Sequence, residues 1–342
     1  MKKITALISV LVSCTLLFTG CGTGNVASDP TPSATPAVTA EPKNTPERIF
    51  LDTYINTDER PVAVMVDNDD QNARPQAGLD EAYLIYEMVV EGGSTRFLAL
   101  FKGVDTEKIG PVRSSRHYFL DYVMENDAIY THFGWSPKAT SDISTFGIQK
   151  INGILGEDAN VFWREEKFKG DWHSAYTSLS KVKAKAESKS YPLTTEQKNG
   201  IEYADSFYTP DSDLLANKVS FNYSGRYKTA YTYNPETKLY EKSIFGNPHV
   251  MQNGEVVTVK NILVELITDT SLGDGTERRN INTAGSGKGY YITDGVYEEI
   301  TWSKASRRDA TIYKRADGSV LKINPGKTIV NLISPEIGAK FE

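Results

Sequence analysis

The sequence predicts an α+β protein, with a mixed α/β N-terminal domain followed by a smaller, antiparallel, β-rich C-terminal domain. Between residues 47 and 195, short valine-rich runs typical of buried strands alternate with stretches that suit helices. From 219 to 342, runs rich in Tyr, Val, Ile and Thr alternate with Asn-Gly and Asp-Gly turn dipeptides. Roughly 295 residues follow residue 46, which is enough for two domains with their own cores.

The first 20 residues have the layout of a signal peptide. Two lysines precede an apolar run of about fifteen residues, too short for a comfortable transmembrane helix. Gly20 stands directly before Cys21, as in a bacterial lipobox. We therefore expect Cys21 to become the acylated first residue, carrying palmitate or a similar chain. The protein would then be lipid-anchored at the extracytoplasmic face of the cell membrane; a plain N-terminal anchor is the alternative.

The remaining composition excludes several classes of function. Only Cys14 and Cys21 are present, so the mature chain offers neither a disulfide nor a free thiol nucleophile. Loss of Lys2 and Lys3 with the signal leaves 38 − 2 = 36 basic against 44 acidic side chains, a net charge of −8. An acidic chain without a basic run does not favour nucleic acid as a partner. Recognition of an anion must then be local.

Two polar segments divide the chain. Residues 21–46 are rich in Pro and Thr and predict a disordered tether, with a reach between roughly 28 Å and 75 Å. Residues 196–218 predict a connector between the N-terminal domain (47–195) and the C-terminal domain (219–342). The folded part would therefore work close to the membrane, in the cell envelope.

The N-terminal domain contains the elements that position the candidate site. We expect a strand at 60–68, a hairpin at 83–103 that turns at Gly92-Gly93, a helix from about 114, a strand at 128–137, and helices near 138–147 and 178–190. "GSGKG" at 285–289 lacks the spacing and the following helix of a phosphate loop, so a β-turn or bulge is favoured. The four histidines show no metal-ligand spacing, and we expect neither a metal nor a cofactor.

Charged residues that break the local pattern mark a candidate site. Counted at 100° per residue, the expected helix turns Arg116 toward the apolar side and leaves Arg113 and Ser114 near its polar stripe. Glu87 interrupts an otherwise apolar strand, so we expect it to meet Arg116. An ion pair that pins the helix to the hairpin would explain Glu87 and Arg116 equally well.

More polar residues gather at the ends of the same elements. Glu91 and Arg96 flank the hairpin turn, Asp67 ends the first strand, and His132 lies in the strand expected at 128–137, with Trp135 close behind it. Arginines, acids, a histidine and a tryptophan in one place are typical of a cleft that binds a sugar carrying carboxylate or phosphate. We therefore take Arg96, Arg113, Ser114, Arg116, His132 and Trp135 as candidate ligand-binding residues.

The same stretches resemble a family. "RPVAVMVDN", "YEMVVEGGSTRFLALF", "IGPVRSSR", "HFGWSP", "FWR" and "HSAYTS" are similar to the signatures of YerB-like bacterial lipoproteins, as are "GSGKG" and "NPGKT" further on. Arg164 in "FWR" and His173 in "HSAYTS" complete the candidate ligand-binding residues. Ile329 departs from the pattern, since a Trp is common there. The resemblance implies two domains on an exported lipoprotein and supplies no chemistry.

Two functions remain open from the sequence. The first is binding of peptidoglycan, another wall glycan or another anionic envelope polymer through the Arg/Glu/His/Trp cluster. The second is glycan cleavage of the lytic-transglycosylase kind, with Glu87 or Glu91 as the general acid. Binding is favoured because it needs no special pKa, whereas a nearby arginine would keep a carboxyl group ionised. The sequence does not specify an oligomeric state.

Overall fold

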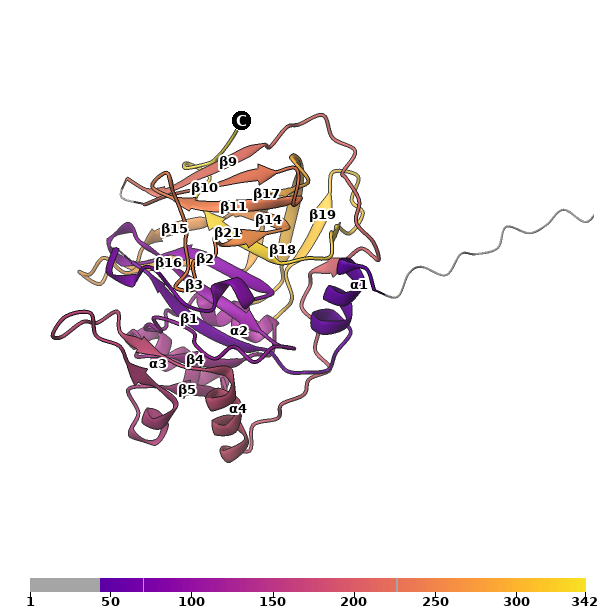
Figure 1. Cartoon of the computed structure of the whole chain (residues 1–342). Coiled ribbons are helices and arrows are strands. Elements are labelled where there is room, and N and C mark those ends of the chain that lie inside the picture. The colour runs from indigo at the N-terminus through magenta and orange to yellow at the C-terminus, as the bar shows by residue number, and fades with distance from the viewer. Residues whose placement is uncertain (1–43, 70, 226) are drawn as a thin grey trace, which may run out of the picture. The chain divides into compact units, whose positions relative to one another are not determined.

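A ten-stranded mixed β-sheet is the centre of the fold (Figure 1). The computed structural model describes residues 44–69, 71–225 and 227–342. The sheet takes five strands from each half of the chain: β1 (Val62–Asn68), β2 (Leu84–Val89), β3 (Thr95–Phe101), β4 (Ile129–His132) and β5 (Lys150–Asn152), then β14 (Asn261–Leu266), β17 (Gly285–Thr293), β18 (Val296–Lys304), β19 (Ile312–Arg315) and β21 (Thr328–Ile333). Their order is β19-β18-β17-β14-β21-β2-β3-β1-β4-β5. The predicted α+β class is confirmed.

The two halves of the chain meet inside this sheet. Strand β21 pairs in parallel with β14 on one side and with β2 on the other. Asn331 in β21 is thereby opposite both Val264 and Glu87. The described residues form one compact unit. The N-terminal and C-terminal regions therefore share a sheet as well as an interface.

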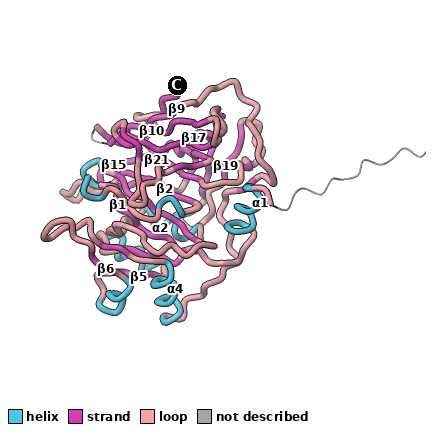
Figure 2. The backbone as a smooth tube through the Cα atoms, in the orientation of Figure 1, coloured by secondary structure: helices cyan, strands magenta, loops and turns pink. Residues whose placement is uncertain are grey.

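A second sheet packs over the C-terminal half (Figures 1 and 2). Its order is β12-β11-β10-β9-β22, and β13 also pairs with β11. Its strands are β9 (Lys218–Ser224), β10 (Tyr227–Asn234), β11 (Leu239–Ile244), β12 (Asn247–Pro248), β13 (Thr258–Val259) and β22 (Ala339–Phe341). Three two-stranded ribbons complete the strands: β6 (Trp163–Arg164) with β7 (Ala175–Tyr176), β8 (Glu202–Tyr203) with β20 (Lys322–Ile323), and β15 (Thr268–Ser271) with β16 (Arg279–Asn282).

Helices are short and lie mainly in the N-terminal half (Figure 2). The α-helices are α1 (Pro46–Phe50), α2 (Phe119–Glu125), α3 (Pro137–Phe146) and α4 (Leu179–Ser188). Short segments of other helix types are η1 (Leu51–Ile55), η2 (Gln71–Ala73), η3 (Leu79–Glu81), η4 (Glu91–Gly93) and η5 (Gly156–Val161). Helix α3 is capped at its N-terminus by Ser136, whose side chain accepts from the Ala139 N–H, and at its C-terminus by Gly147 in the left-handed region. The helices predicted near 138–147 and 178–190 are therefore confirmed.

The predicted hairpin is also present. β2 and β3 are antiparallel and are joined through η4, where Gly92 and Gly93 have φ angles of 69° and 75°. Residues with a Cβ rarely adopt such angles, which explains the two glycines. The "GSGKG" stretch was expected to be a turn or bulge, but it lies in strand β17. A Cβ on Gly289 would lie 2.1 Å from the Val264 carbonyl oxygen, so the neighbouring strand requires a glycine there.

The helix predicted from about residue 114 begins later, at Phe119. Residues 112–115 are extended because they form sheet contacts: Val112 forms a bridge with Val66, and Ser115 forms one with Trp135. Backbone pairing at the sheet therefore overrides the helical pattern. Arg113 and Arg116 lie before the helix, so the helix phase does not determine where they point.

Two ion pairs are buried between the halves of the chain. Lys242 Nζ lies 2.7 Å from Glu87 Oε2, and Lys304 Nζ lies 2.6 Å from Glu125 Oε2. All four side chains are almost completely buried. Each pair joins an acid of the N-terminal half to a lysine of the C-terminal half, so the pairs specify how the halves fit together.

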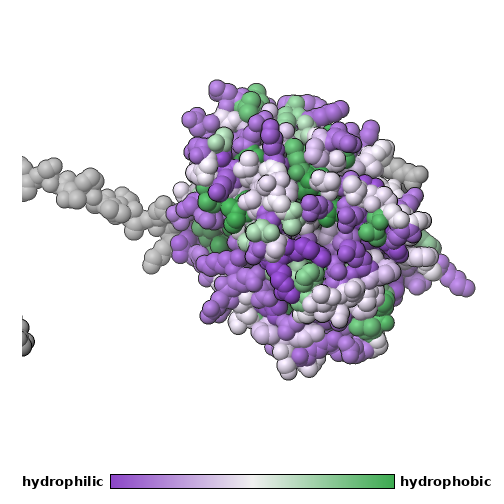
Figure 3. All heavy atoms as spheres, turned by 180° about the vertical axis from the view of Figure 1, so that it is seen from behind, coloured by the Kyte–Doolittle hydropathy of each residue, from purple (hydrophilic) through white to green (hydrophobic). Residues whose placement is uncertain are grey.

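The surface is mainly polar. Figure 3 shows one face on which apolar residues are scattered among hydrophilic ones. Among the residues that the structure describes, no helix is long and apolar enough to cross a membrane. The expected signal peptide, Cys21 and most of the tether lie outside the described residues.

Candidate functional site

The segment 112–115 enters the sheet as extended backbone between the ends of β1 and β4. The Arg113 N–H donates to the Met65 carbonyl at 2.8 Å, and the Phe133 N–H donates to the Arg113 carbonyl at 2.9 Å. β1 and β4 are parallel, so this segment separates them at their carboxyl ends. Such a split at the carboxyl ends of parallel strands is a common place for a ligand site. The sheet therefore presents Arg113 and Ser114 at its edge.

An open hollow of about 460 Å³ lies over this split. Its walls come from the 112–114 segment, the turn after β4, strand β6 and the loop between β6 and β7. The lining residues are Val112, Arg113, Ser114, Phe133, Gly134, Ile154, Arg164, Glu166, Gly170, Asp171 and Trp172. The Trp172 side chain is 73% exposed. The hollow thus combines two arginines with an exposed aromatic ring.

Asp67 holds Arg113 and His173 in place beside the hollow. Its Oδ2 lies 2.8 Å from Arg113 Nε and 2.7 Å from His173 Nδ1. Burial acts to raise the pKa of Asp67, but the His173 hydrogen bond and the charges of Arg113 and Arg96 outweigh it, and the pKa is lowered. Asp67 is therefore ionised, and it orients Arg113 and His173 together.

Arg164 presents a cation that is available to a ligand. Its guanidinium lies 4.5 Å from the centre of the Phe133 ring, and Nη1 donates to Ser174 Oγ at 3.0 Å. No carboxylate among the described residues forms an ion pair with Arg164. The Asp171 carboxylate, which also lines the hollow, accepts from the backbone N–H groups of Lys167 and His173. An anion in the hollow could therefore bind Arg164 without displacing a partner.

Arg96, His132 and Trp135 lie behind the hollow. Arg96 is buried and donates to the Ser114 carbonyl; burial and the charge of Arg116 lower the pKa of Arg96 to about 10. His132 Nδ1 donates to the Gly134 carbonyl at 2.7 Å, and burial lowers its pKa to about 3. Its ring packs between Tyr130 and Trp135. These side chains support the walls and do not line the cavity.

The expected pairing of Glu87 with Arg116 is wrong. Glu87 binds Lys242, and Arg116 Nε instead lies 2.5 Å from Glu91 Oε1. The late start of α2 is the reason, because Arg116 lies before the helix and its side chain reaches the hairpin turn rather than the middle of β2. Neither residue lines the hollow.

The two candidate acids therefore differ in their environment. Glu87 is fully buried, and Thr95 Oγ1 also donates to its carboxylate at 2.8 Å. Glu91 is partly exposed. Its partial burial acts to raise its pKa, but the hydrogen bond and charge of Arg116 outweigh that effect and lower the pKa. Neither environment suits a general acid.

Of the predicted ligand-binding residues, Arg113, Ser114 and Arg164 line the same hollow, and His173 joins them through Asp67. The sequence reasoning missed Asp171 and Trp172. A tryptophan directly after Gly170-Asp171, in a polar loop, is the signal that could have indicated an exposed ring. Within the described part of the chain, no group of three or more His, Cys, Asp or Glu side chains could hold a metal ion.

Comparison with known proteins places these elements in a family. Residues 52–192 match the N-terminal domain, and residues 219–330 the C-terminal domain, of the family described as "Protein of unknown function (DUF3048)". A Bacillus subtilis (strain 168) protein, YerB, named as a candidate lipoprotein, is 33% identical over 293 residues, covering 83% of each chain. The crystal structure of B. subtilis YerB matches with a TM-score of 0.73 and 30% identity, over 83% of this chain and 94% of that one. The chain therefore belongs to the two-domain DUF3048 family of YerB-like proteins.

Proposed function

We propose that the protein is a membrane-anchored envelope lipoprotein that binds an anionic wall glycan, most naturally peptidoglycan, in the hollow lined by Arg113, Ser114, Arg164 and Trp172. The lipobox-like sequence at Cys21 and the naming of its relative YerB as a candidate lipoprotein support the location. The observation that carries the binding proposal is Arg164, an exposed guanidinium without an acidic partner among the described residues, in the same hollow as an exposed tryptophan.

Each lining group suits a different part of a glycan. Arginine forms paired hydrogen bonds with carboxylate or phosphate, whereas a tryptophan ring packs against the apolar face of a sugar. Ser114 Oγ donates to the Phe133 carbonyl at 3.0 Å, so its free lone pairs can accept from a sugar hydroxyl. The hollow is open rather than enclosed, which suits a polymer that continues beyond the site.

Glycan cleavage by Glu87 or Glu91 is not proposed. The Glu87 carboxylate has no access to solvent, and the lowered pKa of Glu91 keeps it ionised in its pair with Arg116. A general acid must carry its proton at the working pH and reach the scissile bond. Binding is therefore the function that the geometry supports best.

Co-sedimentation of the purified protein with peptidoglycan sacculi tests the proposal. The wild-type protein should sediment with sacculi, and Arg164→Ala should reduce the bound fraction on the order of tenfold because a charge-assisted contact is lost. Arg48→Ala is the matched control, since Arg48 is an exposed arginine in α1 paired with Asp52. Equal sedimentation of wild type and Arg164→Ala would contradict binding in this hollow, and release of soluble glycan products would favour catalysis instead.

A further inference from the structure

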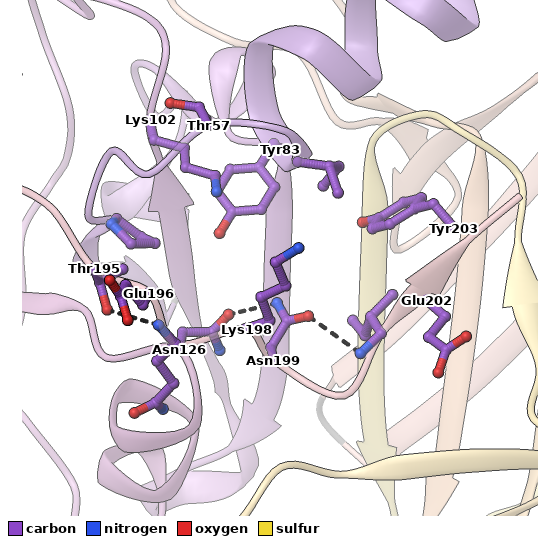
Figure 4. Close-up of a pocket in the computed structure, with 14 residues that line it drawn as sticks. Thr57, Tyr83, Lys102, Asn126, Thr195, Glu196, Lys198, Asn199, Glu202 and Tyr203 are labelled. Carbon is purple, nitrogen blue, oxygen red and sulfur yellow. Dashed lines mark hydrogen bonds between the residues drawn. The ribbon is translucent and has the colours of Figure 1, made fainter. Parts of the chain in front are cut away.

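A second hollow lies at the opposite end of the same strands (Figure 4). It has a volume of about 420 Å³ and lies between the end of β3, the C-terminal end of α2 and the connector residues 195–203. Lys102 directly follows β3, and Asn126 is the C-cap of α2. β1 and β3 are antiparallel, so Lys102 lies beside the first residues of β1, whereas the Arg113 hollow lies beyond its last residues. The two hollows are therefore separate sites.

Two lysines of this second hollow have no acidic partner. The Lys102 ammonium lies 5.5 Å from the centre of the Tyr83 ring. Among the described residues, neither Lys102 nor Lys198 forms a hydrogen bond or ion pair. Glu59, whose charge acts on Lys102, already binds the Gly103 N–H at 2.8 Å and Lys183 at 2.7 Å.

Burial and a neighbouring lysine both disfavour the charged form of Lys102. Burial lowers the pKa of Lys102, and the charge of Lys198 acts in the same direction, although Glu59 partly opposes it. The two ammonium groups repel each other, although the exposure of Lys198 to solvent weakens this repulsion. In Figure 4 the Lys198 side chain rises between Tyr83 and Tyr203, whereas the Glu202 carboxylate points away. An anion bound by both lysines would compensate the burial of the Lys102 charge and its repulsion by Lys198.

A tyrosine hydroxyl in the lining points to the same conclusion. Tyr83 lines the hollow and is 2% exposed, and its hydroxyl forms no hydrogen bond within the described part of the chain. Burial raises the pKa of Tyr83, so the hydroxyl keeps its proton and can donate. The hydroxyl oxygen itself is not sealed from solvent, so a ligand in the hollow can reach it and accept its hydrogen bond.

We propose that this hollow binds a phosphate monoester, held by Lys102, Lys198 and the Tyr83 hydroxyl. Two lysines favour phosphate over carboxylate, because an ammonium is a compact point charge and lacks the planar fork by which arginine grips a carboxylate. Ile55, Pro61 and Ile201 offer apolar surface for the organic part of the ligand. The same chemistry is found in a soluble phosphate ester and in the headgroup of phosphatidic acid.

Calorimetric titration of the purified full-length protein tests this proposal. The soluble probes are glycerol 1-phosphate and inorganic phosphate, with acetate as the carboxylate control. Vesicles of phosphatidylcholine with and without phosphatidic acid test the lipid source. Lys198→Gln should weaken phosphate binding on the order of tenfold, and Tyr83→Phe by roughly threefold to tenfold. Lys288→Gln, an exposed lysine in β17, is the control and should bind as the wild type does.

The outcomes distinguish a soluble phosphate ester from a lipid headgroup, and they can also disprove the phosphate site. Saturable binding of glycerol 1-phosphate alone would identify a soluble ester, and additional binding to the phosphatidic acid vesicles would identify the headgroup. Lys198 is exposed, so Lys198→Gln should keep the wild-type fold. The proposal is wrong if neither phosphate probe nor vesicle binds, if acetate binds as tightly as phosphate, or if Lys198→Gln and Tyr83→Phe bind as the wild type does.

Discussion

The Glu87–Lys242 pair and the Arg113–Asp67 pair show how similar charged residues serve different purposes in one fold. Glu87 and Lys242 are sealed between the two sheets and are surrounded by protein groups. Asp67 is equally buried, but its partner Arg113 reaches an open hollow beside Arg164 and Trp172. A charged residue that interrupts an apolar pattern therefore indicates a buried network or a site equally well. Access to solvent distinguishes the two.

Removing one charge of the buried Glu87–Lys242 pair should have the largest effect on stability. Lys242→Met leaves the Glu87 carboxylate buried without its cation, so we expect a loss of roughly 3–5 kcal/mol in the free energy of unfolding. Urea denaturation followed by circular dichroism measures it. The double variant Glu87→Gln/Lys242→Met should recover part of the loss because no charge remains buried. If Lys242→Met unfolded at the same urea concentration as the wild type, Lys242 would not be the cation that neutralises a buried Glu87.

A second buried acid, Glu265, should make the free energy of unfolding depend on pH. Glu265 is fully buried; burial and the nearby Glu125 raise its pKa to about 7, although hydrogen bonds from Tyr313 and Tyr122 partly oppose this. Because the folded pKa lies above the unfolded value, folding favours the protonated form. This contribution is fully present below pH 4.5, the ordinary value, and is lost as the pH rises to about 7.

The variant Glu265→Gln isolates that effect, because its amide cannot ionise. Between pH 4.5 and pH 7.5 the wild type should lose about 3 kcal/mol of unfolding free energy relative to Glu265→Gln. Urea denaturation of both proteins across this range is the measurement. Parallel pH profiles for the two proteins would exclude Glu265 as the titrating group.

Asp67→Asn tests a residue that is buried like Glu87 but whose partner Arg113 lines the open hollow. We expect a loss of about 2 kcal/mol in stability, because Arg113 and His173 lose a charged acceptor, together with weaker binding to sacculi. The matched control is Asp269→Asn, which removes the acid of the Asp269–Arg279 pair in the β15–β16 ribbon. That variant should leave binding intact. If both variants bind alike, Asp67 does not orient the hollow.

Trp172→Ala should have the smallest effect on stability and a clear effect on binding. The side chain is 73% exposed, so the unfolding free energy should change by less than about 0.5 kcal/mol. Sacculus binding should weaken by roughly tenfold because the aromatic surface is lost. Leu215→Ala, another exposed apolar residue, is the control. If Trp172→Ala binds sacculi as the wild type does, the Trp172 ring does not contribute to the site.

Local patterns predicted much of the fold. The Val-rich β1, the Gly92-Gly93 hairpin and the Ser-capped helices α3 and α4 follow from short-range rules, and all are present. The start of α2 could not be predicted this way, because residues 112–115 pair with strand ends from elsewhere in the chain. The parallel junction of β21 with β2 joins residues about 240 positions apart, and no local pattern encodes such a contact.

The candidate site was predicted in part for the same reason. Arg113, Ser114 and Arg164 were expected to bind ligand, and the structure brings them to one hollow. The partner of Glu87 was missed because Lys242 lies 155 residues away, in the second sheet. Trp172 was missed because a single exposed ring in a loop has no periodic signal.

The most direct test follows the Trp172 indole N–H in nitrogen-15 NMR spectra while a soluble peptidoglycan fragment that carries a muramic carboxylate is added. The chain has four tryptophans, and Trp302 is buried at β18, away from the hollow. The proposed site predicts a saturable shift of the Trp172 signal and no shift of the Trp302 signal, with the Trp172 shift lost in Arg164→Ala. A fragment that binds while the Trp172 signal stays unchanged would contradict it.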